Sequence, residues 1–376
     1  MLGGALPIGA PNSDPEALAA AADAVAAALN DAGQACVLPG VLLRRLGLQG
    51  AAARFLDASG LPFATMFADK SVLGEDRPDY IGMYVGRLMG ESVRAFVESC
   101  DVVVMIGARL SDGNTAGNTV RLDPVKTIAI DHHRTTVGPT VYRNVEMADI
   151  LALLPDRVTK RAPRTQIAPE TLGPIVGGGE DSITADTLYP RWANFFRHDD
   201  VIITDTGTSS LGLTLARLPR GAEFHNQTLW ASIGWATPAA FGAAVGAPDR
   251  RVILITGEGS HQMTVQEIGQ FGRHGLRPII FVLNNSGYLS ERMLCKDMGL
   301  SYNDIAAWNY AELPHAMGCQ GWFDARVHTC GALDDALEKA EHADGAAYIE
   351  VVTDADEAPP MYEKLHENVK SFYNIR

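Results

Sequence analysis

Two turns rich in glycine and asparagine contain the side chains of this chain that are best suited to chemistry. The first turn reads GEGS at residues 257–260 and follows the apolar run 252–255. The second reads NNSGY at residues 284–288 and follows the apolar run 279–283. Short apolar runs bounded by turn residues predict buried parallel strands, whose carboxyl ends meet at one edge of a sheet. Both turns should therefore lie where α/β proteins bind ligands.

The residue types in these turns suit a metal-bound diphosphate. Glycines let the backbone approach phosphate oxygens, and Ser260 and a helix expected to begin near His261 offer a hydroxyl and unpaired N–H groups. Glu258 and the side-chain amide of Asn285 supply hard oxygen atoms, which Mg²⁺ prefers. We therefore predict a cofactor site at this edge. In the alternative interpretation, Asn285 only caps the helix that follows it.

The order GEGS and then NN resembles the GDGS and NN motif of the thiamine diphosphate enzymes. Residues 284–292 (NNSGYLSER), 302–305 (YNDI) and 308–310 (WNY) are similar to the pyruvate, indolepyruvate and phenylpyruvate decarboxylases rather than to acetolactate synthases. The resemblance extends over nearly the whole chain. It implies an α/β fold of two tandem Rossmann-like domains with mainly parallel sheets, and thiamine diphosphate and Mg²⁺ as cofactors.

The resemblance also implies individual cofactor contacts. The turn 205–209 (DTGTS) is similar to the family turn that holds the far end of the diphosphate. Ile233 matches the apolar wedge between the two thiamine rings, and the Ala231 carbonyl matches the acceptor for the 4′-amino group. The residues expected to bind the cofactor are Asp205, Thr206, Gly207, Thr208, Ser209, Ala231, Ser232, Ile233, Gly257, Glu258, Gly259, Ser260, Asn285, Gly287, Tyr288 and Leu289.

Metal ligation is expected from Glu258, Asn285 and the Gly287 carbonyl. The family has Asp in the place of Glu258, so one additional methylene moves the carboxylate, and Mg²⁺ demands near-octahedral oxygens at about 2.1 Å. We expect Glu258 to remain a ligand. In the alternative interpretation it only supports the ligands from behind, or the site binds Mg²⁺ weakly.

Glu291 is the expected catalytic residue. It lies where the decarboxylases keep a carboxylate beside the reacting carbon, so the resemblance implies that it assists protonation after CO₂ leaves. A place between Tyr288 and an apolar helix would raise its pKa by desolvation, whereas the alternative is a surface ion pair with Arg292. Ser290 is smaller and more polar than the Ile or Val of these relatives, which favours an aromatic or bulky 2-oxo acid over pyruvate.

The hydrophobic pattern predicts two domains, at residues 1–160 and 181–376, joined by a linker at 161–180. A helix capped by Asp14 is expected from Pro15 to about Ala32. Further expectations are a helix near Thr184, a helix after Trp235, and strands at 35–38, 62–65, 101–106, 126–131, 201–204, 252–255, 279–283 and 347–352.

Full-length relatives carry a pyrimidine-binding domain before these two domains. We therefore expect this chain to be the large subunit of a split decarboxylase that produces an aldehyde and CO₂. A separate small subunit would supply the pyrimidine domain, in a heterotetramer with two copies of each chain. Two alternatives stay open, namely a carboligase that forms acyloins and a non-catalytic regulatory or binding paralogue.

Composition limits the other partners. The 376 residues carry a formal net charge of −14 without a basic stripe, which argues against nucleic acid and anionic membranes. No apolar run approaches the ~20 residues of a membrane span, so we expect a soluble, cytoplasmic protein acting on a small 2-oxo acid. Five widely spaced cysteines without a CxxC pair predict neither a disulfide framework nor a zinc site. His132 and His133 follow a predicted strand and are expected to have a structural or solvent-facing role.

Overall fold

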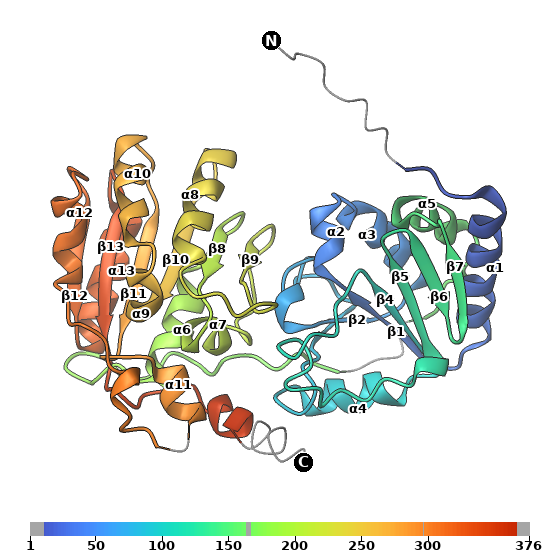
Figure 1. Ribbon diagram of the computed structural model, residues 1–376, viewed down its shortest axis with the longest axis horizontal. Helices are drawn as coiled ribbons and strands as arrows, with labels where there is room; N and C mark the ends of the chain where they lie inside the picture. Colours follow the sequence, from blue (N-terminus) through green and yellow to red (C-terminus); the bar gives the residue numbers. More distant parts are fainter. Residues whose placement is uncertain (1–10, 163–166, 296, 367–376) are drawn as a thin grey trace, which may run out of the picture.

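The computed structural model describes residues 11–162, 167–295 and 297–366. Two α/β domains each contain one sheet with helices on both faces (Figure 1). The predicted fold class, mixed α/β with mainly parallel sheets, is confirmed. The predicted linker at 161–180 falls partly outside the described residues, and the rest of it runs without a helix or strand between the two domains.

The first sheet has seven strands in the order β3-β2-β1-β4-β5-β6-β7. The five neighbours β3, β2, β1, β4 and β5 pair in parallel. Strands β5, β6 and β7 form an antiparallel meander at the edge. The strands are β1 (Ala35–Pro39), β2 (Phe63–Thr65), β3 (Tyr80–Met83), β4 (Val102–Ile106), β5 (Thr127–Asp131), β6 (Arg134–Val137) and β7 (Thr140–Arg143).

Helices bury both faces of this sheet. Val104 of β4 packs toward α1, α3 and α5, whereas its neighbour Met105 packs toward α4, because side chains alternate along a strand. Asp14 accepts hydrogen bonds from the N–H groups of Glu16 and Ala17, so the predicted cap of the first helix is confirmed. The helices are α1 (Pro15–Asp31), α2 (Val41–Arg45), α3 (Gln49–Ser59), α4 (Glu91–Ser99) and α5 (Met147–Leu153), with 3-10 turns η1 (Phe67–Asp69), η2 (Pro124–Lys126) and η3 (Leu154–Asp156).

The second sheet is parallel throughout, in the order β12-β13-β11-β10-β8-β9. Its strands are β8 (Val201–Thr204), β9 (Glu223–His225), β10 (Val252–Gly257), β11 (Ile279–Asn284), β12 (Phe323–Val327) and β13 (Ala347–Val352). One face packs against α6 and α13, and the other packs against α8, α10 and α12.

The helices of the second domain include several short ones at the carboxyl ends of strands. They are α6 (Ala185–Phe195), α7 (Thr208–Gly212), α8 (Ala236–Gly246), α9 (Glu258–Gln262), α10 (Ile268–Arg273), α11 (Leu289–Leu294), α12 (Leu313–Ala316) and α13 (Cys330–His342), with 3-10 turns η4 (Val265–Glu267), η5 (Ser301–Asn303) and η6 (Tyr310–Glu312). None of the helices in the described part of the chain is long and apolar enough to cross a membrane. All five cysteines are free thiols in this structure.

Five strands were not among the predicted ones, namely β3, β6, β7, β9 and β12. All five lie at a sheet edge or in the antiparallel meander, and all except β3 are partly exposed, so these four lack a continuous apolar run. β3 and β9 have only four and three residues. Short strands at the edge of a sheet give little sequence signal of their own, whether they are exposed or, like β3, buried.

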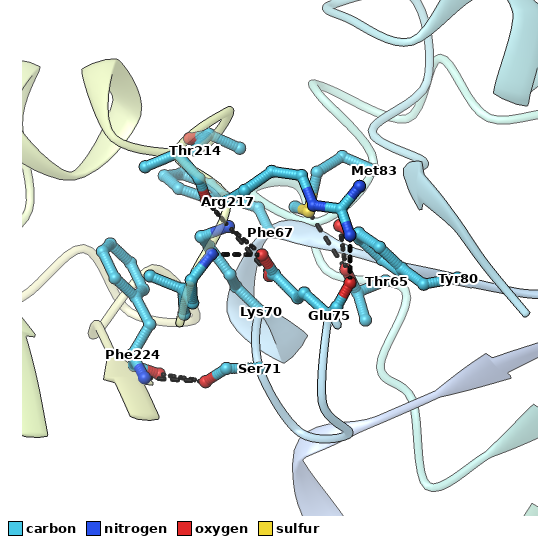
Figure 2. A network of polar contacts seen from close by, with 12 residues as sticks. Thr65, Phe67, Lys70, Ser71, Glu75, Tyr80, Met83, Thr214, Arg217 and Phe224 are labelled. Carbon is cyan, nitrogen blue, oxygen red and sulfur yellow. Dashed lines mark hydrogen bonds and ion pairs between the residues drawn. The ribbon is translucent and has the colours of Figure 1, made fainter. Parts of the chain in front are cut away.

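A buried ion pair joins the two domains between the loop after β2 and the segment after α7 (Figure 2). Lys70 Nζ lies 2.8 and 3.1 Å from the two carboxylate oxygens of Glu75 and donates to the Ala216 carbonyl at 2.7 Å. The backbone N–H of Leu218 donates to the same carboxylate at 3.3 Å. Because Lys70 and Glu75 are 1% and 3% exposed, the ion pair belongs to the interdomain core.

Two further contacts extend this ion-pair network (Figure 2). Arg217 donates to the Glu75 carbonyl at 2.7 Å, and the Ser71 hydroxyl accepts from the backbone N–H of Phe224, also at 2.7 Å. The network thus holds the chain between α7 and β9. It positions the turn after β8 on one side and the loop before α8 on the other.

Candidate cofactor and metal site

The carboxyl ends of β8, β10 and β11 meet at one edge of the second sheet, where α7, α9 and α11 begin (Figure 1). A cavity of about 260 Å³ lies at this edge. All residues predicted to contact the cofactor, the metal or the substrate line it except Asp205 and Ser232. The lining residues are Thr206, Gly207, Thr208, Ser209, Ala231, Ile233, Gly257, Glu258, Gly259, Ser260, Asn285, Gly287, Tyr288, Leu289, Ser290 and Glu291.

Glu258 is the first residue of α9, so this helix begins three residues before the predicted start near His261. Its side chain is buried, and Oε1 accepts from the N–H groups of Asn285 at 3.1 Å and Gly287 at 2.8 Å. Burial raises the pKa of Glu258 to about 7, although these N–H groups and the Arg292 charge favour the ionised form. A cation bound to this buried carboxylate would therefore stabilise its ionised form.

Asn285 presents the second oxygen. Its Oδ1 is buried and has no hydrogen-bond partner among the described residues. An unpartnered buried acceptor costs about 1–3 kcal/mol, which a bound cation would offset. The oxygens of Glu258 and Asn285 are of the kind that Mg²⁺ prefers. This donor set fits the metal that the sequence predicts.

Gly287 occupies a position in the metal site where no side chain fits. A Cβ atom at this position would lie 2.2 Å from Arg292 Nη2 and 2.5 Å from the Asn303 carbonyl oxygen. Arg292 in turn donates to the carbonyls of Asn285 and Ser286, at 3.2 and 2.6 Å. The buried guanidinium therefore fixes the turn that brings the Asn285 side chain and the Gly287 backbone to Glu258.

The turn after β8 is built for close approach of a ligand. Gly207 has a φ of 139°, a conformation that favours glycine, and it precedes the first helical residue, Thr208. The Tyr189 hydroxyl donates to the Thr208 carbonyl at 2.9 Å, which fixes the start of α7. The first N–H groups of a helix have no intrahelical partner, so this turn suits the oxygens of an anion.

Asp205 lies beneath this turn and does not line the cavity. Its carboxylate accepts from the N–H of Thr206 at 3.0 Å, the N–H of Gly234 at 3.1 Å and the hydroxyl of Thr256 at 3.3 Å. Burial raises its pKa to about 6. Asp205 thus joins three neighbouring segments and positions the turn, whereas Ser232 is exposed and lies outside the cavity wall.

The segment before α8 leaves apolar side chains in solvent beside the cavity. Trp230 is 75% exposed and Ile233 is 39% exposed, and Ala231 between them has a φ of 49°. Met263, 57% exposed, lies on the same side, because a Cβ atom on Gly234 would come within 2.6 Å of the Met263 Cβ. We refer to Trp230, Ile233 and Met263 as the apolar rim.

Glu291 lies on α11 and lines the cavity, but its side chain is exposed. The predicted desolvation between Tyr288 and an apolar helix is therefore absent from this structure. The alternative of a surface pair with Arg292 is wrong, because Arg292 is buried and forms its ion pair with Asp304 at 3.2 Å.

Tyr362 contacts the cavity residue Ser290 from behind the cavity wall, and the sequence did not indicate this contact. Its hydroxyl lies 2.8 Å from the Ser290 hydroxyl, and its ring is buried among residues of both domains. The 72 positions between the two residues explain why no local pattern could connect them. Ser290 is thus a cavity residue whose hydroxyl already has a partner.

Comparison with known proteins agrees with this geometry. Residues 205–351 match the C-terminal TPP-binding domain of thiamine pyrophosphate enzymes, and residues 22–154 match the central domain of the same enzymes. An alpha-keto-acid decarboxylase of Mycolicibacterium paratuberculosis is 36% identical over 365 residues, and one of Mycobacterium ulcerans is 35% identical over 367 residues. Each alignment covers 96% of this chain but 64% of the relative, so the chain spans about two thirds of the relatives' length.

Two solved structures share the fold. Benzoylformate decarboxylase from Polynucleobacter necessarius superposes with a TM-score of 0.72 at 16% identity, over 96% of this chain and 69% of that one. A putative thiamin diphosphate-dependent enzyme from Mycobacterium smegmatis gives 0.70 at 22% identity, over 94% and 67%. With a central and a C-terminal cofactor-binding domain matched in order, and with related alpha-keto-acid decarboxylases along almost its entire length, this chain belongs to the thiamine diphosphate-dependent enzymes.

Proposed function

We propose that this chain is the cofactor-binding subunit of a Mg²⁺- and thiamine diphosphate-dependent decarboxylase. Its substrate would be an aromatic or bulky 2-oxo acid, converted to an aldehyde and CO₂. One observation carries the proposal: the buried carboxylate of Glu258 and the unpartnered Oδ1 of Asn285 line one cavity with the turn after β8. The alpha-keto-acid decarboxylases among its relatives support the reaction class.

Each part of the cavity has a distinct task in this proposal. Glu258, the Asn285 side chain and the Gly287 carbonyl hold Mg²⁺, and the turn 206–209 together with Ser260 binds the diphosphate. Thiamine diphosphate, when bound, supplies the electron sink for loss of CO₂. Glu291 is the group on the cavity wall that can deliver a proton to the substrate carbon that has lost CO₂.

A partner subunit with a pyrimidine-binding domain completes the site in this proposal, in an assembly with two copies of each chain. The cavity volume of about 260 Å³ lies below the ~300 Å³ at which ligand pockets usually begin. The apolar rim and the exposed Glu291 lie beside it. Docking of the partner would bury the rim and desolvate Glu291. The unpaired cysteines support a reducing cytoplasmic location.

The metal assignment is tested by measuring cofactor binding. We expect Glu258→Gln to abolish Mg²⁺-dependent binding of thiamine diphosphate in calorimetry, because a neutral amide cannot replace the anionic ligand. Glu258→Asp should retain or improve binding, since Asp is the family residue at this place. Glu350→Gln is the matched control, because Glu350 is also buried but does not line the cavity. Unchanged affinity in Glu258→Gln would remove Glu258 from the metal ligands.

The reaction and the partner are tested by reconstitution. The chain alone should not decarboxylate 2-oxo acids, and activity should appear when a pyrimidine-domain subunit is added. Aldehyde as the main product supports decarboxylation, whereas acyloin formation would identify a carboligase. Turnover by the purified chain alone would contradict the partner requirement while leaving the metal assignment intact.

Substrate size is tested at Ser290. Ser290→Ile should reduce activity on aromatic 2-oxo acids more than on pyruvate, because a larger side chain then lines the cavity. Tyr362→Phe is the control, since it removes only the hydroxyl that contacts Ser290. An equal loss on all 2-oxo acids would remove Ser290 from the determinants of specificity.

A further inference from the structure

A second group of potential metal ligands lies in the first domain, remote from the cofactor cavity. His132 and His133 form the two-residue turn between β5 and β6, where Asp131 pairs with Arg134 across the hairpin. Glu146 follows β7 and directly precedes α5. One ligand atom from each of His132, His133 and Glu146 lies within 4.8 Å of the other two.

The backbone of the turn directs both imidazoles to the same side. His133 has a φ of 62°, a left-handed conformation that is rare for residues other than glycine. Neighbouring side chains on a strand normally point to opposite faces, but here the two ring centroids are 3.5 Å apart. His133 Nδ1 lies 2.6 Å from Glu146 Oε1, and His132 Nδ1 lies 3.9 Å from Oε2.

The carboxylate at the centre is mostly buried. The Glu146 side chain is 11% exposed, whereas those of His132 and His133 are 44% and 50% exposed. Within the described ranges, the two histidines are the only basic groups in ion-pair distance of Glu146. The nearby Arg109 and Arg134 both pair with Asp131 instead. The site thus combines one anionic oxygen and two nitrogens without a permanent cation.

Backbone contacts hold Glu146 in place. Its N–H donates to the Ser13 hydroxyl at 2.8 Å, and the same hydroxyl donates to Asp149 at 2.6 Å. The carbonyl of His133 accepts from the N–H of Val145 at 3.4 Å, which joins the turn to the segment before α5. The backbone that carries the carboxylate is therefore fixed, and the exposed imidazoles lie where they can adjust to bind an ion.

We propose that His132, His133 and Glu146 bind a divalent transition-metal ion of the zinc class. Zn²⁺ takes His nitrogens and carboxylate oxygens at 2.0–2.2 Å in a tetrahedral arrangement, which separates the ligand atoms by about 3.4 Å. The contact of His132 with Glu146 shortens to reach this value, and that of His133 lengthens. Three protein ligands leave the fourth position to water.

Metal binding replaces the hydrogen bond between His133 and Glu146. In neutral His133, the proton moves from Nδ1 to Nε2, so that the Nδ1 lone pair faces the ion. If the imidazole is protonated, one proton is released. The ion would join the β5–β6 turn to the start of α5 and stabilise the first domain. This inference does not depend on the proposed decarboxylase function, because its ligands lie in the other domain.

The test is a titration of the purified, metal-free 376-residue chain with Zn²⁺ in calorimetry, with saturating Mg²⁺ and thiamine diphosphate present to occupy the cofactor site. We expect one Zn²⁺ per chain, with at least ~10-fold weaker binding in His132→Gln and His133→Gln. His328→Gln is the matched control, because His328 is exposed and lies in the second domain. Co²⁺ as a spectroscopic probe should give the intense visible absorption of a four-coordinate ion.

Thermal unfolding gives a second readout, which also shows whether each variant is folded. Zn²⁺ should raise the melting temperature of the wild type and of His328→Gln, but not that of His132→Gln, whose exposed side chain can be replaced without loss of the fold. Equal Zn²⁺ affinity in the wild type and both turn variants would overturn the proposal. So would a Co²⁺ spectrum typical of six water-like ligands.

Discussion

Two of the buried glutamates, Glu75 and Glu258, lie at functionally different places, and their charges are balanced in different ways. Glu75, at the interdomain contact, lies 2.8 Å from the Lys70 ammonium and accepts a backbone N–H. Glu258, at the cofactor cavity, accepts two backbone N–H groups but has no ion-pair partner among the described residues. Both are 3% exposed or less, so the difference lies in what balances the charge.

The comparison shows how a structural carboxylate differs from one that is kept for a ligand. At Glu75 the protein supplies the cation, and the charge is neutralised in the isolated chain. At Glu258 burial raises the pKa to about 7, so the isolated chain holds this charge at a disadvantage near neutral pH. A metal bound to this carboxylate would remove that disadvantage.

The largest effect is expected from removing the cation at the interdomain contact. Lys70→Met leaves the Glu75 charge buried and unpaired, which should destabilise the chain by about 3–5 kcal/mol in urea denaturation. The double variant Lys70→Met, Glu75→Leu should be less destabilised than the single one, because no charge is left unpaired. It would still lose the hydrogen bonds to Ala216 and Leu218.

Arg94→Met is the control for this experiment. Arg94 pairs with Glu91 at 3.7 Å on the surface of α4, and such exposed pairs contribute less than ~1 kcal/mol. If Lys70→Met is no more destabilising than Arg94→Met, the charge of Glu75 is not held by Lys70, and the contrast with Glu258 disappears.

A smaller effect is expected from the pH dependence of Glu258 in the metal-free chain. Its folded pKa of about 7 lies above the ordinary 4.5, so its contribution to stability is full below about pH 4.5 and is lost as the pH rises to 7. The loss amounts to about 3 kcal/mol. The free energy of unfolding, measured by urea titration from pH 5 to 7.5, should fall less steeply in Glu258→Gln than in the wild type.

Asp69 and Asp205 also have raised pKa values, about 7 and 6, so the difference between the two chains isolates Glu258. Mg²⁺ with thiamine diphosphate should flatten the wild-type profile and leave that of Glu258→Gln unchanged. Identical profiles for the metal-free wild type and Glu258→Gln would show that this carboxylate is ionised without penalty.

The cofactor cavity was predictable because its parts are local in sequence. Glycine turns after apolar strands determine which backbone atoms lie at the sheet edge. The parallel pairing of β8, β10 and β11 brings these turns to the same edge. Asp205 shows the limit of such motifs. Its place in the turn was correct, but the side chain points into a hydrogen-bond network beneath the cavity, which a motif cannot show.

The interdomain contacts and the contact of His133 with Glu146 were not predictable, because their partners are distant in sequence or meet through edge strands. Lys70 meets the Ala216 carbonyl across 146 positions, and Ser290 meets Tyr362 across 72. His133 and Glu146 are 13 residues apart, but their contact depends on the antiparallel strands β6 and β7, which carry no continuous apolar run. Contacts that depend on edge strands and on domain docking can be identified only from the structure.

The smallest effect is expected at Arg292, the cation whose field acts on Glu258. Arg292→Met should raise the pKa of Glu258 further, because one favourable charge is lost while burial remains. The expected shift is less than about one pH unit, which corresponds to ~1 kcal/mol. The variant also loses hydrogen bonds to Asn285 and Ser286, so the readout is the pH midpoint of stability and not its absolute value.

Asp304→Asn completes this last test, because it breaks the Arg292 ion pair but keeps the guanidinium charge. Removing the Asp304 carboxylate leaves the Arg292 charge without its ion-pair partner, so the pH midpoint should stay or move slightly down. A midpoint that rises in Arg292→Met and stays or falls in Asp304→Asn would show that the Arg292 charge favours the ionised form of Glu258. A midpoint that rises in Asp304→Asn, or does not move in Arg292→Met, would mean that backbone N–H groups alone hold the Glu258 charge.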